Sequence, residues 1–210
     1  PESFTNDNLH LLGPTPEVEN FYVACGMNSK GIAASGGLGK ILADWVIDGH
    51  PSGEITETDV RRNNAVQTTD NYVKARIPEA LGHTYAMHWP FYQYQTARNL
   101  VQSPLHQALL DQGACFGEVG GYERPNWFAR NGAPAEYDYS YKRQNWFEFS
   151  AAEHTAVREN VGVYDISSFG KFEVTGKDAV TTLQNLSCAN IDVDHGQVVY
   201  TQWLNERGGI

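Results

Sequence analysis

Hydrophobic positions near the start of the chain switch from strand-like to helix-like spacing. Residues 20–25 form a short apolar run that Gly26 ends, which predicts a buried strand. From Leu38 to Val46, apolar side chains recur at i, i+3, i+4, i+7 and i+8, the spacing of one helical face. We expect this helix to begin in a glycine-rich stretch made of Gly36, Gly37 and Gly39.

The middle of the chain mixes helical and extended patterns. We expect a helix over residues 64–80, a strand over 85–89, and a second helix after Ser103, which can cap it. The glycines, aromatics and charges of residues 120–128 indicate a packed surface turn. The buried stripe of the second helix is expected to be Leu105, Leu109 and Leu110.

The last third of the chain predicts an α+β unit. Ser150 and Glu153 have the spacing of a capping box, so a helix is expected to start there and to run to about Asn160. A strand over 163–174, a helix over 177–186, a strand over 198–204 and a hairpin turn over 204–210 complete the pattern.

The patterns together indicate an α+β / α/β multidomain chain. We expect one domain to end near residue 58, a second to cover 59–130, a linker at 131–144 and a third domain at 145–210. Because the first residue is Pro1 and the last run resembles a hairpin entering another strand, the chain is expected to be an internal piece of a longer protein.

Composition narrows the class of protein. Hydrophobic residues make up 41% of the chain and charged residues 19%, which is typical of a globular protein. The net charge of −10 argues against a nucleic-acid partner, since phosphate binding needs clustered Lys and Arg. No apolar run approaches the ~18 residues of a membrane span. Three distant cysteines predict reduced, buried thiols rather than disulfides: Cys25, Cys115 and Cys188.

The segment from Gly26 to Gly39 holds the most informative residues. Five glycines among fourteen residues allow the backbone to approach a flat ligand closely. The helix that follows directs unpaired amides and partial positive charge at whatever lies before it, which favours an anion. Composition alone favours a glycine-rich turn that merely packs tightly, because glycine-rich turns before helices are common, and the spacing is not the GxGxxG of dinucleotide-binding folds.

Other polar residues carry weaker signals. The histidines show no paired spacing of the kind that binds metal, so no metal site is predicted and surface or hydrogen-bonded roles are expected. Asp165, which follows an aromatic residue, either serves a site or caps a turn. The histidines considered are His50, His83, His88, His106, His154 and His195.

Three groups of motifs resemble one family. They are similar, in this order, to the end of the flavin domain, the central domain and the start of the aminomethyltransferase-like, folate-binding domain of dimethylglycine and sarcosine dehydrogenases. The matching stretches are residues 1–5, 21–32 and 36–45, then 98–105 and 121–128, then 162–172 and 200–210.

The resemblance implies an FAD-dependent oxidative demethylation of a small N-methyl amine. Flavin would take a hydride from the methyl group, and tetrahydrofolate would capture the carbon. Tyr200 and Asn205 are expected near folate, although Tyr200 equally suits an ordinary strand core. The catalytic residues, the amine and the electron acceptor are not identified. The flavin-binding candidates are Gly26, Met27, Asn28, Ser29, Lys30, Gly31, Gly36 and Gly37.

Two other hypotheses remain. The regulatory subunit of pyruvate dehydrogenase phosphatase resembles the same layout without acting as a dehydrogenase. A lone aminomethyltransferase does not account for residues 1–130. The resemblance implies a cytoplasmic location for a bacterial protein and the mitochondrial matrix for a eukaryotic one.

Overall fold

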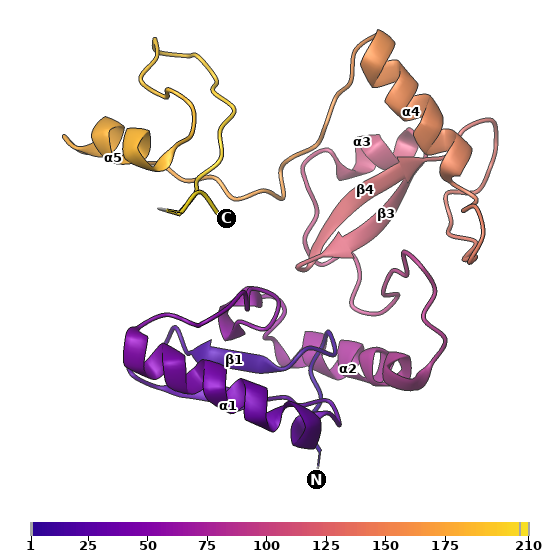
Figure 1. Ribbon diagram of the computed structural model, residues 1–210. Helices are drawn as coiled ribbons and strands as arrows, with labels where there is room; N and C mark the ends of the chain where they lie inside the picture. The colour runs from indigo at the N-terminus through magenta and orange to yellow at the C-terminus, as the bar shows by residue number, and fades with distance from the viewer. Residues whose placement is uncertain (1, 206, 210) are drawn as a thin grey trace. The chain divides into compact units, whose positions relative to one another are not determined.

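The computed structural model describes residues 2–205 and 207–209 (Figure 1). The chain divides into two compact units, Pro1–Ser168 and Phe169–Ile210, which are described separately. Helices and small antiparallel sheets occur together, so the α+β / α/β fold class predicted from the sequence is confirmed.

The first unit opens with a two-stranded hairpin and a long helix. Strand β1 (Leu11–Pro14) pairs antiparallel with β2 (Tyr22–Cys25), which confirms the strand predicted at residues 20–25. Helix α1 (Gly31–Asp48) packs on this hairpin through the buried Trp45. Gly13 makes this contact possible, because a Cβ atom there would lie 2.6 Å from the Trp45 ring. A short 3-10 helix, η1 (Val60–Arg62), lies beside β1.

Helix α1 begins earlier than the hydrophobic spacing suggested. Its first residue is Gly31, so the prediction of a start at the glycines 36, 37 and 39 is wrong, and these glycines lie inside the helix. Glycine inside a helix costs roughly 0.5–1 kcal/mol relative to alanine. Burial of Leu38 and of Trp45, whose ring lies against Gly13 of the hairpin, offsets this cost.

Two elements connect the hairpin region to the next sheet. Helix α2 (Asp70–Tyr85) begins after Thr69, whose hydroxyl accepts a hydrogen bond from the Tyr72 amide. It starts later than the predicted residue 64, because the Asn64 side chain holds a turn by accepting from the Val66 amide. The predicted strand over 85–89 is wrong, since no strand is assigned there and Tyr85 is the last residue of α2.

The second sheet contains the main core. Strands β3 (Ala114–Val119) and β4 (Tyr122–Phe128) form an antiparallel hairpin, with helix α3 (His106–Asp111) against β3 and helix α4 (Phe147–Glu159) against β4. The Trp127 ring is 1% exposed and stacks on Phe149 at 5.4 Å. The prediction of a surface turn at 120–128 is wrong, because only Gly120 and Gly121 turn and the rest is strand.

Two helix starts also differ from prediction. The capping box is wrong, because Ser150 lies inside α4 and the Glu153 carboxylate accepts from the Phe128 amide at 2.8 Å instead. Leu105, which precedes α3, and Leu110 within it are 47% and 43% exposed, so the predicted leucine stripe is wrong. His106 takes the buried position.

Buried ion pairs join these elements across the sequence. The Arg76 guanidinium on α2 lies 2.6 Å from the Glu118 carboxylate on β3, and both side chains are almost fully buried. Arg98 and Glu123 form a second pair at 2.6 Å. Each pair links segments that are distant in the sequence.

The second unit contains helix α5 (Ala179–Leu186), as predicted. The strands predicted at 163–174 and 198–204 are wrong: neither forms a ladder among the residues that the structure describes, apart from an isolated bridge between Ser187 and Trp203. A strand needs a neighbour along its length to satisfy its backbone, whereas residues 198–204 are joined to residues 187 and 188 by this single bridge and by a hydrogen bond from the Cys188 amide to the Gln202 carbonyl at 3.1 Å. The predicted hairpin at 204–210 includes residues 206 and 210, which lie outside the described residues.

The cysteines and the helices complete the comparison with the sequence. All three cysteines are free, as expected, but only Cys115 is buried, while Cys25 and Cys188 are exposed. Within the described part of the chain, no helix is both long enough and apolar enough to cross a bilayer.

Candidate functional site

The loop between β2 and α1 has an unusual backbone. Gly26, Asn28 and Ser29 have φ values of 64°, 49° and 62°, in the left-handed region. At Gly26 a side chain is excluded twice, by this conformation and because a Cβ atom would collide with the methyl group of Thr5. Six of the predicted flavin-binding residues, 26–31, thus form one continuous segment, in which residues 26–30 are the loop and Gly31 is the first residue of α1.

Asn28 holds this loop in place. Its side chain is 1% exposed, and its Oδ1 atom accepts from the Thr5 amide at 2.9 Å. Its Nδ2 group donates to the Thr5 hydroxyl at 3.0 Å and to the Gly26 carbonyl at 2.6 Å. The Asn28 amide donates to the Ser3 carbonyl at 3.0 Å. The polar atoms of Asn28 therefore face the protein and fix the loop to residues 3–5.

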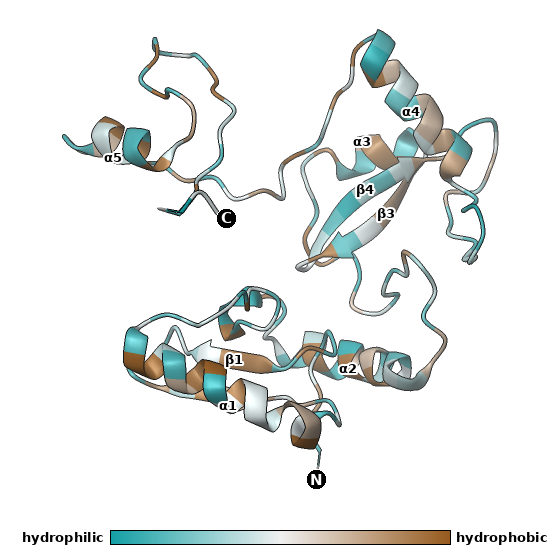
Figure 2. Cartoon of the chain, in the orientation of Figure 1, coloured by the Kyte–Doolittle hydropathy of each residue, from teal (hydrophilic) through white to brown (hydrophobic). Residues whose placement is uncertain are grey.

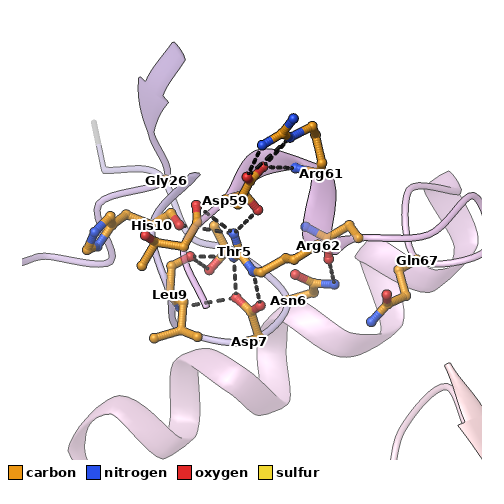
Figure 3. Close-up of polar contacts among 12 residues, drawn as sticks. Thr5, Asn6, Asp7, Leu9, His10, Gly26, Asp59, Arg61, Arg62 and Gln67 are labelled. Carbon is orange, nitrogen blue, oxygen red and sulfur yellow. Dashed lines mark hydrogen bonds and ion pairs between the residues drawn. The ribbon is translucent and has the colours of Figure 1, made fainter. Parts of the chain in front are cut away.

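The segment that receives Asn28 is itself held by Arg62 of η1 (Figure 3). The Arg62 guanidinium contacts both carboxylate oxygens of Asp7, at 2.7 and 2.9 Å, and donates to the Leu9 and His10 carbonyls at 2.9 and 3.1 Å. The Thr5 hydroxyl donates to the Leu9 carbonyl at 2.8 Å. Arg62 thus fixes the backbone of residues 7–10. The Thr5 hydroxyl, which bonds to both the Leu9 carbonyl and the Asn28 side chain, connects this segment to the loop.

Two titrating groups lie beside this arginine. Partial burial, and then the positive charge of Arg62, lower the pKa of His10. Burial raises the pKa of Asp59, but hydrogen bonds from the Arg61 side chain and amide outweigh it, so the pKa of Asp59 is lowered overall. At neutral pH the cluster therefore contains an ionised Asp59 and a His10 that resists protonation.

The first turn of α1 carries partial positive charge. The first amides of a helix have no partner within it, and no acidic residue lies in the first turn to neutralise them. Lys30, the N-cap residue, adds a full charge and is exposed. Figure 2 shows the hydrophobic and neutral residues of these first turns. Beside the exposed side chains of Lys30 and Ile32, the residues of these turns up to Gly37 are small: Gly31, Ala33, Ala34, Ser35, Gly36 and Gly37.

The other predicted site residues have different positions. Gly36 and Gly37 lie on an exposed part of α1, where a Cβ atom added to either would have no neighbour within 4 Å, roughly one and a half turns beyond Gly31. Met27 is partly buried beside Gly31. The Ser29 hydroxyl donates to the Glu2 carboxylate at 2.7 Å, so it is already engaged.

The two predicted folate residues belong to the second unit. Tyr200 is 88% exposed. The Asn205 Oδ1 atom accepts from the amides of Arg207 and Gly209, both at 3.0 Å, and so shapes a turn.

Sequence reasoning missed Thr5 and Arg62 as parts of the site. Thr5 belongs to the first motif of the resemblance, which was the available signal, whereas nothing in the local sequence marks Arg62. Asp165 accepts from the Ser167 amide at 3.0 Å, as a turn-capping residue does. Among the described residues, no three His, Cys, Asp or Glu side chains are grouped to hold a metal ion.

Two family models match the chain. Residues 48–103 match the FAD dependent oxidoreductase central domain, and residues 105–210 match the GCVT N-terminal domain. The domain boundaries proposed from the sequence, at residues 58, 130 and 144, stay predictions.

Curated relatives match over the full chain. It is 50% identical to 4-methylaminobutanoate oxidase (formaldehyde-forming) of Paenarthrobacter nicotinovorans, covering 26% of that protein. It is 38% identical to the mitochondrial pyruvate dehydrogenase phosphatase regulatory subunit of Mus musculus, covering 24%, and 36% identical to the mitochondrial sarcosine dehydrogenase of Homo sapiens, covering 26%. The chain thus spans about a quarter of the length of these relatives.

The order of the two matched domains and the names of the relatives agree with the motifs found in the sequence. The chain belongs to the dimethylglycine and sarcosine dehydrogenase family, and within it residues 48–103 match an FAD dependent oxidoreductase central domain and residues 105–210 a GCVT N-terminal domain.

Proposed function

We propose that the whole protein is an FAD-dependent enzyme that oxidatively removes a methyl group from a small N-methyl amine. The observation that carries this proposal is the β2–α1 loop, in which a bare backbone and the positive end of an 18-residue helix are held rigidly by Asn28. The relatives support the substrate class, since their names include oxidases and dehydrogenases of N-methyl amines.

Three observations support the binding of a flavin ring at this loop. Residues 26–31 contain two glycines, so the backbone can approach a flat ring. The amides of the first α1 turn and the Lys30 ammonium favour negative charge, which a reduced flavin carries near its N1 and O2 positions. Asn28 prevents the loop from rearranging, because its polar atoms are already bonded within the protein. We propose that these residues bind and orient the flavin, and that Gly36 and Gly37 extend the same bare surface.

Bound flavin would supply hydride acceptance from the N-methyl carbon of the amine. The chain's contribution would be electrostatic: fixed amides stabilise negative charge without having to reorient when that charge develops. Water would then attack the resulting iminium carbon to release formaldehyde and the demethylated amine, unless another nucleophile captures that carbon first.

We propose that tetrahydrofolate is that second nucleophile, bound by the GCVT-type domain near Tyr200 and Asn205. The exposed Tyr200 ring would be available to stack on a flat ring, and Asn205 would hold the Arg207 and Gly209 amides in place. Formaldehyde release should fall when tetrahydrofolate is added. A formaldehyde yield that equals amine consumed, with or without tetrahydrofolate, would reject capture while leaving the demethylation intact.

The test of the main proposal is an absorbance spectrum of the whole protein between about 350 and 500 nm, because hydride transfer bleaches the oxidised flavin band. Sarcosine, dimethylglycine and 4-methylaminobutanoate would be added in turn, without oxygen. Bleaching by one of them is the expected result and identifies the amine. A flavin band that none of them bleaches contradicts the substrate class.

The second candidate is a regulatory protein without dehydrogenase activity. It is supported by the 38% identity to the phosphatase regulatory subunit over the whole chain. The same spectrum separates the two functions, since a purified protein with no flavin band would favour regulation. The compartment would follow the source: mitochondrial, as the names of the mouse and human relatives state, or cytoplasmic in a bacterium.

A further inference from the structure

The boundary between the two family matches differs from the boundary between the two compact units. The matches meet at residue 104, whereas the first unit runs from Pro1 to Ser168. Residues 105–168 of the GCVT match are therefore built into the same compact unit as residues 48–103 of the central match. We call residues 48–103 the central part, residues 105–168 the GCVT part, and the contact between them the seam.

Two buried ion pairs cross the seam. In both, the arginine belongs to the central part and the carboxylate to the β3–β4 hairpin of the GCVT part. Arg76 of α2 lies 2.6 Å from Glu118 of β3, and their side chains are 2% and 5% exposed. Arg98 donates to both oxygens of Glu123 on β4, at 2.8 and 2.6 Å, and the Glu123 side chain has no exposed surface. The two carboxylates of the hairpin are thus matched by two arginines of the central part.

Backbone groups add to these pairs. The Asn99 amide donates to the Glu123 carboxylate at 2.6 Å, and the Glu123 amide donates to the Val101 carbonyl at 2.9 Å. At the turn of the hairpin, the Asn64 side chain donates to the Gly120 carbonyl. The hairpin is therefore bonded to the central part along β4 and at its turn.

The arginines are also fixed within the central part. The Arg76 guanidinium donates to the Tyr72 hydroxyl at 3.0 Å and to the Thr96 carbonyl at 2.6 Å, and it lies 4.4 Å from the centre of the Tyr94 ring. Arg98 donates to the Tyr94 carbonyl at 3.1 Å. Neither guanidinium can follow its carboxylate without losing these contacts.

Aromatic rings also meet across the seam. Three pairs, each with one ring from residues 89–92 and one from 139–146, have centroid distances of 4.9, 5.2 and 5.4 Å. Within the GCVT part, His106 of α3 packs on Phe116 of β3 at 4.2 Å and is 7% exposed, so the surface role expected for this histidine is wrong. The pairs that cross the seam are Trp89 with Tyr141, Phe91 with Trp146, and Tyr92 with Tyr139.

Separating the two parts would leave buried charges without partners. Burial raises the pKa of Glu123, but hydrogen bonds from Arg98 and the Asn99 amide outweigh it and lower the pKa, so the carboxylate stays ionised. Removing one partner of a buried ion pair is strongly destabilising, because the remaining charge is uncompensated. An exposed pair such as Arg143 and Glu148 carries no such penalty.

We propose that the seam is a conformational lock: the central part and the GCVT part open and close as one cooperative body, and the connection at Pro104 is not a hinge between them. Any event that loosens α2 then loosens the β3–β4 hairpin equally, because neither can move away without leaving a buried charge. None of the residues of the seam is a flavin or folate candidate, so the lock holds whichever function the whole protein has.

Native-state hydrogen exchange of the whole protein, with any flavin it carries, tests this lock. Exchange is followed by mass spectrometry of peptides in increasing urea below the unfolding transition, and the amides of α2 are compared with those of β3 and β4. The expected result is one shared opening reaction with the same urea dependence. An opening that exposes the hairpin while α2 stays protected, or the reverse, overturns the proposal.

A variant tests the role of the ion pair. Glu118→Gln keeps the side-chain shape and an acceptor for the Gly121 amide, but leaves the Arg76 charge buried without a counter-charge. We expect exchange in α2 and in the hairpin to accelerate together about a hundredfold. The matched control is Glu148→Gln, which breaks the exposed pair with Arg143 and should change exchange less than about threefold. Acceleration confined to the hairpin overturns the proposal, and so does equal acceleration in α5 of the second unit, which would indicate global unfolding.

A double variant tests the electrostatic cause. Adding Arg76→Met to Glu118→Gln removes the uncompensated charge, so exchange in α2 and in the hairpin should slow about tenfold relative to Glu118→Gln alone. A double variant that exchanges as fast as Glu118→Gln overturns the lock by buried charge. If a variant does not fold, the urea dependence of the unsubstituted protein decides by itself whether the two parts open together.

Discussion

Replacing Asn28 by alanine removes the contact that fixes the β2–α1 loop. The Thr5 amide and the Gly26 carbonyl, both bonded to the Asn28 side chain, would then lie without these partners in a buried region. Each such loss costs about 1–3 kcal/mol, so we expect the free energy of unfolding to fall by about 2–6 kcal/mol. Alanine at a φ of 49° adds about 1 kcal/mol of backbone strain.

Asn20→Ala is the matched control for this strain. Asn20 has a φ of 60° but is exposed, and none of the described side-chain hydrogen bonds involves it. The difference between the two variants therefore isolates the buried hydrogen bonds. Urea unfolding of the whole protein, followed by tryptophan fluorescence, measures both variants, and the flavin absorbance at equal protein concentration measures cofactor retention.

The expected result is a clear separation of the two variants. Asn28→Ala should unfold at lower urea and retain less flavin, whereas Asn20→Ala should lose only about 1 kcal/mol and keep its flavin. Equal destabilisation of the two would show that backbone strain, not the Thr5 contact, sets the cost. Full flavin retention in a destabilised Asn28→Ala would separate the loop's stability from cofactor binding and refute the positioning role.

Three further predictions concern other contacts. Gly26→Ala should destabilise the protein more than Gly49→Ala, because both glycines have positive φ but only Gly26 lies against the Thr5 methyl group; equal unfolding midpoints would contradict this. At neutral pH a thiol reagent should modify the exposed Cys25 and leave Cys115 unmodified, since burial raises the Cys115 pKa to about 11. Mass spectrometry of the labelled peptides measures this, and labelling of Cys115 in preference to Cys25 would contradict it. Burial raises the pKa of Glu79, but hydrogen bonds from Thr96, Tyr92 and two amides outweigh it and lower the pKa below 4.5. The ionised Glu79 carboxylate therefore stabilises the folded protein fully above pH 4.5, and this stabilisation is lost as the pH falls further. Glu79→Gln should therefore reduce the acid dependence of the unfolding midpoint below that pH, and an unchanged dependence would contradict the assignment.

Local patterns predicted elements whose partners lie nearby in the chain. The strand at Tyr22–Cys25 pairs with β1 only a few residues away, and helix α5 matches its predicted range closely. The glycine-rich loop after β2 was also recognised, because a strand, a glycine and a helical pattern follow one another directly. Such features depend on short-range sterics and periodicity, which a single sequence records.

Element starts were predicted less well, because capping depends on competing partners. Glu153 has the spacing of a capping box, yet its carboxylate bonds to the Phe128 amide 25 residues away. Helix α1 begins at Gly31, before Gly36, Gly37 and Gly39, because burial of Leu38 and of Trp45, whose ring lies against Gly13 of the hairpin, compensates for weak local propensity. Tertiary contacts of a few kcal/mol override propensities of about 1 kcal/mol or less per residue.

The chain's own residues were enough to indicate its family, its mixed α and β composition and the loop at 26–31. The anchoring of that loop required the fold, because Thr5 meets Asn28, and Asp7 meets Arg62, across 23 and 55 residues. The same holds for the buried ion pairs, since Arg76 meets Glu118 across 42 residues and Arg98 meets Glu123 across 25. Periodicity reports which face of an element is apolar, but which polar side chains meet there is set by long-range packing, and that packing leaves no local signal in the sequence.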